Sequence, residues 1–124
     1  MMSNLTDFEW KFNSPVASWR HNCKSIVKQY DFPIRSAVPL RDETGVAVVE
    51  PFEEKGRDNA VVFNADGSER FRLRFPLPEP HGNCFDQMYY IRQVLTAIAN
   101  LRGVDFAYEL NEQTGDVLKS YETR

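Results

Sequence analysis

The chain lacks the short motifs that mark common kinds of catalysis. It has no glycine-rich phosphate loop, no G-x-S-x-G nucleophile elbow and no H-E-x-x-H metal motif. Paired carboxylates occur as Asp42-Glu43 and Glu53-Glu54. Each pair falls in an expected turn or loop, where solvated charge is the ordinary explanation. The sequence therefore favours a protein that is not an enzyme and that uses no cofactor.

Long apolar runs are also absent. No run approaches the roughly 20 residues that span a bilayer. The first residues, MMSNLTDFEWKF, lack the basic and apolar regions of a secretory signal. We therefore expect a soluble, cytoplasmic protein of the bacterial kind, without membrane contact. The length of 124 residues and a hydrophobic content of 42% predict a single globular domain over residues 1–124.

An excess of basic residues is missing as well. The chain has 15 lysines and arginines against 18 aspartates and glutamates, which gives a formal net charge of −3. A dedicated nucleic-acid binder is expected to be strongly basic, so nucleic acid is disfavoured as a partner. The same charge balance favours a basic protein partner.

Cysteine and histidine are scarce, with two of each, and they lie in two close pairs. Together they form a Cys2His2 set, which is a complete tetrahedral zinc shell: His21, Cys23, His81 and Cys84. The spacings are unlike those of known zinc motifs, and neither cysteine has the flanking signals of a Cys–His nucleophile pair. The sequence favours two thiols, with zinc as the alternative and no metal as the prediction.

The segment Asn59–Phe75, NAVVFNADGSERFRLRF, has the pattern of a β-hairpin. Small, β-branched and aromatic residues precede the turn sequence Asn-Ala-Asp-Gly. The return strand then alternates between two faces. One face, predicted to be buried, holds Phe71, Leu73 and Phe75. The other, predicted to be exposed, holds Arg70, Arg72 and Arg74.

Other segments have similar patterns. Strands are predicted at Phe8–Phe12, Val46–Val49, Val104–Leu110 and Val117–Tyr121. A charged loop is expected over Glu53–Asp58, and a stiff extended connection over Pro76–Asn83. The segment Val16–Tyr30 fits either a helix or two short strands.

The segment Phe85–Leu101 is ambiguous. Its apolar residues match helical spacing, whereas Tyr89-Tyr90-Ile91 is typical of a strand. Turn glycines at 45, 67 and 115 are separated by 22 and 48 residues. The second gap is about twice the first, so regularly spaced turns would include one without glycine near Arg92-Gln93. We predict a mostly β fold in which antiparallel hairpins form a sandwich or a partly closed barrel. The alternative is an α+β fold with one helix near 86–101.

Two charged features are candidate binding surfaces. The arginines at 70, 72 and 74 would lie about 7 Å apart along one strand face, where they could hold an anion or RNA. From Asp42 to Asp58 the local charge is −4, from six acidic residues and two basic ones. Loops on a rigid sheet are common binding positions, and the acidic residues are Asp42, Glu43, Glu50, Glu53, Glu54 and Asp58.

Two turn-containing segments, VVFNADGSERF at 61–71 and DFAYELNEQTG at 105–115, belong to a compact, acidic, aromatic-rich chain. In these features the chain resembles the small bacterial immunity proteins of contact-dependent or polymorphic toxin systems. The resemblance implies a cognate toxin domain as the partner, neutralised by occlusion of its active site. We place this contact at the six acidic residues of the Asp42–Asp58 segment.

Two other functions remain open. One is a small-ligand-binding protein or enzyme with a pocket lined by Trp10, Trp19, Tyr89 and Tyr90. The other is an anion- or RNA-binding module that uses the arginine face. The sequence leaves the oligomeric state open.

Overall fold

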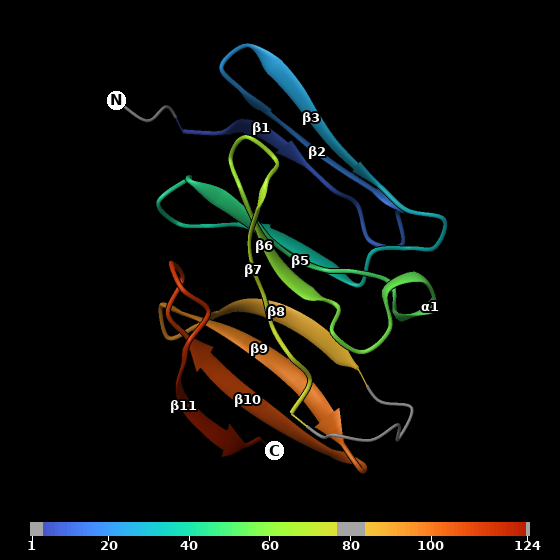
Figure 1. Ribbon diagram of the computed structural model, residues 1–124, viewed down its shortest axis with the longest axis vertical. Helices are drawn as coiled ribbons and strands as arrows, with labels where there is room; N and C mark the ends of the chain where they lie inside the picture. The colour runs from blue at the N-terminus through green and yellow to red at the C-terminus, as the bar shows by residue number, and fades with distance from the viewer. Residues whose placement is uncertain (1–3, 77–83, 124) are drawn as a thin grey trace.

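The computed structural model describes residues 4–76 and 84–123, which form three stacked antiparallel sheets (Figure 1). The first sheet contains β1 (Thr6–Glu9), β2 (Val16–His21) and β3 (Lys24–Gln29). The central sheet contains β4 (Ser36–Pro39), β5 (Gly45–Val49), β6 (Ala60–Asn64) and β7 (Glu69–Arg72). The third contains β8 (Phe85–Ile91), β9 (Val94–Leu101), β10 (Val104–Leu110) and β11 (Val117–Glu122). A single helical turn, α1 (Phe52–Lys55), follows β5.

The central sheet is buried on both faces. Val46 and Val48 of β5 pack toward the first sheet, whereas Ala47 and Val49 pack toward the third. The residues of β6 divide between the same two clusters. A strand covered on both faces has apolar residues at successive positions instead of alternating ones. This is why GVAVV and AVVF are continuous apolar runs.

The mostly β prediction and the antiparallel hairpins are confirmed, and the three layers form a sandwich. The partly closed barrel is wrong, because in the described residues each sheet ends in a strand that pairs on one side only. The segment Val16–Tyr30 forms two strands. One turn of helix occupies part of the charged loop expected over Glu53–Asp58. Most of the Pro76–Asn83 connection lies outside the described residues.

The helix considered over 86–101 is also wrong. The chain forms β8 and β9, joined by the turn expected at Arg92-Gln93. Both turn residues have positive φ, 50° and 68°, as two-residue hairpin turns require. The apolar spacing looked helical because buried residues occupy successive positions of β9, a central strand of its sheet. Successive residues from Leu95 to Ala99 are all buried.

The central hairpin is confirmed, with β6 paired to β7. Leu73 and Phe75 are each 8% exposed, and Phe71 packs against the core that they belong to. The prediction for the arginine face is wrong at two of its three positions. Arg70 and Arg72 are half-buried, and of the three arginines only Arg74 is exposed.

Among the described residues, no helix is long and apolar enough to cross a membrane.

Candidate functional site

The outer face of the third sheet, which points away from the central sheet, contains a hollow of about 760 Å³. Its lining includes Ile98 of β9, with Tyr89 of β8 and Tyr121 of β11 toward its two sides. The register of the sheet places Thr96 and Ala107 on the same face. Both are fully buried, so solvent does not reach these two side chains between the residues that line the hollow.

Carboxylates are in excess around this hollow. Its lining includes four acidic residues and two basic ones, a balance of −2, and these are Asp86, Asp105, Glu109, Glu122, Arg92 and Lys119. We refer to this surface as the acidic hollow. Two of its charges are partly neutralised. Asp86 forms an ion pair with Arg35 at 3.0 Å, and Glu109 lies directly opposite Lys119 in the sheet.

The acidic hollow has the chemistry of a site for cationic side chains. Asp105 accepts one hydrogen bond, from the Asn100 amide at 3.0 Å, and a carboxylate can accept several more. Tyr89 is 40% exposed. An aromatic ring beside carboxylates can hold an ammonium or guanidinium group through its π face. The lining of the hollow is therefore suited to ammonium and guanidinium groups.

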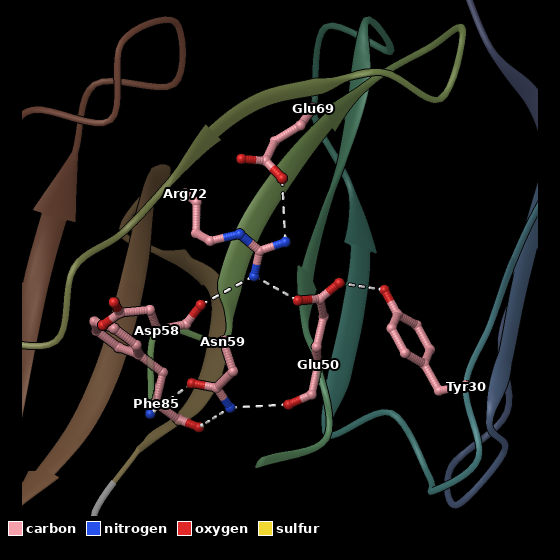
Figure 2. A network of polar contacts seen from close by, with 7 residues as sticks. All are labelled: Tyr30, Glu50, Asp58, Asn59, Glu69, Arg72 and Phe85. Carbon is pink, nitrogen blue, oxygen red and sulfur yellow. Dashed lines mark hydrogen bonds and ion pairs between the residues drawn. The ribbon is translucent and has the colours of Figure 1, made fainter. Parts of the chain in front are cut away.

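A second polar cluster lies on the other side of the molecule, between the first and central sheets. Glu50 is 2% exposed, and both of its carboxylate oxygens have partners. One accepts from the Tyr30 hydroxyl and the other from Arg72, each at 2.5 Å (Figure 2). Arg72 also donates to the Asp58 carbonyl at 2.9 Å and to Glu69 at 3.1 Å.

These contacts perturb the pKa of two groups in the cluster. Burial raises the pKa of Tyr30, and the hydrogen bond to the Glu50 carboxylate raises it further. Burial alone would lower the pKa of Arg72, but its contacts with Glu50 and Glu69 outweigh that effect and raise it. The phenol stays protonated and the guanidinium stays charged. The cluster is thus a closed structural network that connects β5, β7 and the residue after β3.

Asn59 extends this network to the third sheet. Its amide nitrogen donates to the carbonyls of Glu50 and Phe85, at 2.8 and 3.1 Å, and its amide oxygen accepts from the Phe85 backbone N–H at 3.0 Å (Figure 2). Asn59 itself is fully buried. A single side chain therefore satisfies backbone groups of both sheets where β8 begins.

The acidic segment Asp42–Asp58 does not form one surface. Asp42 and Glu43 precede the five residues of β5, whereas Glu53 and Glu54 follow them on α1. At about 3.4 Å per residue, the two groups are separated by roughly 17 Å. The prediction that Glu50 contacts a partner is wrong, because its side chain is buried in the network described above.

Other carboxylates of this segment stabilise backbone turns. Glu54 accepts from the backbone N–H groups of Asp31 and Phe32. Asp58 accepts from the Phe75 N–H at 2.7 Å. Asp42 accepts from the N–H and hydroxyl of Thr44, at 3.0 and 2.8 Å, and Glu43 accepts from the Asn4 amide at 3.3 Å. Asp42, Glu43, Glu53 and Glu54 are exposed.

The arginine face is also used inside the molecule. Arg70 lies in a bulge of β7 and makes four hydrogen bonds. Its guanidinium donates to the Asn64 amide oxygen at 2.6 Å, to the carbonyl and hydroxyl of Thr44 at 3.0 Å, and to the Glu112 carbonyl at 3.1 Å. Arg70 thereby connects two turns of the central sheet to the β10–β11 loop. An anion clamp formed by Arg70, Arg72 and Arg74 is therefore wrong.

The cysteines and histidines are distributed over different sheets. Cys23 is exposed at the β2–β3 turn, and His21 ends β2 in the same sheet. Cys84 is buried just before β8, and burial raises the pKa of its thiol. His81 lies outside the described residues. Among the residues that are described, no cluster of three or more histidines, cysteines or carboxylates could hold a metal ion.

The four aromatic residues considered for a ligand pocket do not share one. Trp19 is 1% exposed and donates its ring N–H to the Ala65 carbonyl in the core. Trp10 lies beside the first sheet. Tyr89 and Tyr90 are neighbours on β8 and point to opposite faces. The aromatic pocket predicted from sequence is therefore wrong.

Comparison with protein-family models, with curated proteins and with solved structures gives no significant match for this chain.

Proposed function

We propose that this chain binds a cationic protein partner through the acidic hollow and acts as an immunity-type inhibitor of a toxin domain. The observation that supports the proposal is the hollow itself. Its lining includes four acidic residues and two tyrosines, from strands at both sides of the third sheet. It combines a volume of about 760 Å³ with an excess of carboxylates.

The chemistry of the expected partner fits this surface. Toxins that act on nucleic acid need a basic cleft, because they must neutralise phosphates. Carboxylates such as Asp105 and Glu109 can occupy the positions that phosphates would take in that cleft. Tyr89 and Tyr121 would supply rigid aromatic contacts, which are common energetic centres of protein interfaces. Charge would then set the rate of association, and the aromatic contacts the rate of dissociation.

A pair of charge-matched variants tests the proposal. In the first, the hollow is neutralised by D105N, E109Q and E122Q. In the second, the exposed carboxylates of the acidic segment are neutralised by D42N, E43Q and E53Q. Each variant changes the net charge by +3, so a general loss of attraction affects both equally. Only the first variant changes the local field of the hollow.

The measurement is the rate of association with the neighbouring gene product at low and high salt. We expect the hollow variant to associate about tenfold more slowly at low salt, and the difference to shrink as salt screens it. The segment variant should stay within about twofold of the parent rate. The reverse ranking would move the interface to the Asp42–Asp58 segment. Failure of the parent protein to bind or to protect against any neighbouring gene product would remove the immunity function itself.

A further inference from the structure

An apolar groove of about 260 Å³ lies at the edge of the core, between the chain that continues β7 and the inner face of the third sheet. Its lining includes the buried side chains of Leu73 and Phe85, together with Tyr108 of β10 and Val117 of β11. The volume is just below the range of about 300–1,000 Å³ that drug-sized ligands occupy. The groove is therefore large enough for one aromatic ring or one short branched chain.

Val117 lies on the core side of the sheet without being covered. The register places it opposite Leu110, which is 2% exposed in the core. Residues that lie opposite each other in an antiparallel pair share one face, so Val117 is on the core side as well. It is nevertheless 53% exposed. A ligand in the groove would remove this apolar surface from water, which favours binding.

One end of the groove is held in place by the β10–β11 loop. Gly115 has a φ of 84° and lies against the ring of Phe71, where an added Cβ atom would be 2.5 Å from a ring carbon. Arg70 donates to the Glu112 carbonyl at 3.1 Å and so connects the same loop to β7. A preformed groove binds a ligand without the cost of ordering its walls.

The charged residues that line the groove in the described part of the chain are two arginines, Arg72 and Arg74. Glu50 and Glu69 balance the charge of Arg72. Arg74 is exposed, and it forms neither an ion pair nor a hydrogen bond with any other described residue. The groove therefore has a positive charge that this acidic chain does not neutralise.

Tyr108 provides a second polar group. Its side chain packs against the core, and its hydroxyl makes no hydrogen bond within the described segments. Burial raises the pKa of this hydroxyl, so the phenol keeps its proton and can donate at neutral pH. The groove thus combines an apolar lining with two available donors, a guanidinium and a phenol.

We propose that the groove binds a small carboxylic acid with an apolar body, such as an arylacetate. The body lies against Leu73, Phe85 and Val117. The carboxylate accepts hydrogen bonds from the Arg74 guanidinium, which can hold both oxygens, and from the Tyr108 hydroxyl. Inorganic phosphate fits less well, because it has no apolar group for this lining and needs more donors than the groove supplies. The site does not depend on the proposed inhibitor function.

Phenylacetate and phenylacetamide are matched probes, because they have the same shape and differ in charge. Each is titrated into the protein while NMR follows the backbone amide signals. We expect phenylacetate to bind with a dissociation constant of about one millimolar, given its size, and to shift the amides of Tyr108, Gly115 and Val117. Phenylacetamide should bind at least about threefold more weakly. Equal affinity of the two probes, or no saturable shift at these amides, would overturn the proposal.

The variants V117D and V117N place side chains of equal size at the groove, one charged and one neutral. Val117 is 53% exposed, so both variants should fold. The new carboxylate should weaken phenylacetate binding in V117D by about fivefold or more relative to V117N, through charge repulsion. Phenylacetamide should bind both variants alike. Equal binding of phenylacetate to the two variants would overturn the site.

A second set of variants tests the two donors. R74Q and R102Q each remove one positive charge, but Arg102 lies between β9 and β10, outside the groove. R74Q should weaken phenylacetate binding by about threefold or more, and R102Q should leave it unchanged. Equal affinities of these two variants would overturn the assignment of the carboxylate to Arg74.

Y108F separates binding from stability. The Tyr108 hydroxyl has no partner among the described residues, so its removal should leave the urea midpoint at the parent value. Phenylacetate binding should weaken by about twofold or more, because one hydrogen bond to the carboxylate is lost. A lower urea midpoint with unchanged binding would overturn the role of Tyr108 as a donor.

Discussion

The central sheet and the third sheet are built from the same kind of antiparallel hairpin, but they differ in what covers them. Both faces of the central sheet are buried, and Val46–Val49 are all completely inaccessible. The third sheet is covered on its inner face, where Leu95, Ala97 and Ala99 join the core. Its outer face carries the acidic hollow. Burial on two faces leaves no surface for a partner, whereas burial on one face leaves a rigid sheet that can display a site.

The polar groups of the two sheets differ in the same way. In the central sheet Glu50, Arg70 and Arg72 are satisfied by partners inside the molecule. In the third sheet the acidic side chains lie around an open hollow. The same residue types therefore have partners inside the molecule in one layer and line a surface hollow in the other. Substitutions in the two sheets can test that contrast, and the largest effect is expected at Glu50.

Removing the Glu50 carboxylate should cause the largest loss. E50A leaves Arg72 without its buried partner, and breaking a buried pair costs about 3–5 kcal/mol of unfolding free energy. Denaturant unfolding measures this loss. E53A removes an exposed carboxylate from α1 and should change stability by no more than about 0.5 kcal/mol. Equal effects of the two substitutions would contradict a structural role for the network.

The double variant E50L/R72M sharpens this test. Replacing a buried ion pair with apolar side chains of similar size is often neutral or stabilising. We expect the double variant to recover most of the loss seen in E50A. A double variant as unstable as E50A would mean that the other contacts of Arg72, to Asp58 and Glu69, provide the larger share.

The same substitution in a buried and an exposed position should separate the two sheets. Leu73 is 8% exposed, in the core between the sheets, and Leu118 is 63% exposed on β11. L73A should cost about 2–4 kcal/mol through lost burial and a cavity. L118A should change stability by about 0.5 kcal/mol or less. The measurement is urea unfolding of both variants and of the parent protein under the same conditions.

A smaller effect is expected at alkaline pH. Burial raises the pKa of Tyr90 from its ordinary value of 10 to about 12, and its hydrogen bond to Glu112 acts in the same direction. The folded state therefore holds this proton more tightly than the unfolded state. The stability linked to it is complete below pH 10 and is lost as pH rises from 10 to about 12. Burial also raises the pKa of Tyr30 and Tyr108, in the same direction.

The variant Y90F measures this contribution. It is less stable at neutral pH because it loses two hydrogen bonds, one with Glu112 and one with the Arg41 N–H. Above pH 10 its unfolding free energy should fall less steeply than that of the parent, because the variant lacks the Tyr90 phenol whose pKa is raised in the folded state. Parallel curves over that range would contradict a raised pKa at Tyr90.

The acidic hollow is a candidate site that local sequence patterns did not locate. Its carboxylates come from β8, β10 and β11, so no short segment has an unusual charge. The Asp42–Asp58 segment does have an unusual charge, but its residues fall at opposite ends of β5. One signal was present in β10. Asp105, Ala107 and Glu109 alternate with aromatic and apolar residues, which indicates a polar face with a small residue at its centre.

The sequence by itself determined the mostly β fold class, most of the turns and the hairpin over 59–75. Strand periodicity and the positive φ of turn residues are local properties, which neighbouring residues decide. Only the tertiary structure decided that Glu50 and Arg72 are buried together, that Arg70 connects three turns, and that the outer face of the third sheet stays open. A two-residue period tells which side of a strand a residue lies on. What covers that side depends on residues far away in the chain, and this decides whether a charge is structural or free to bind.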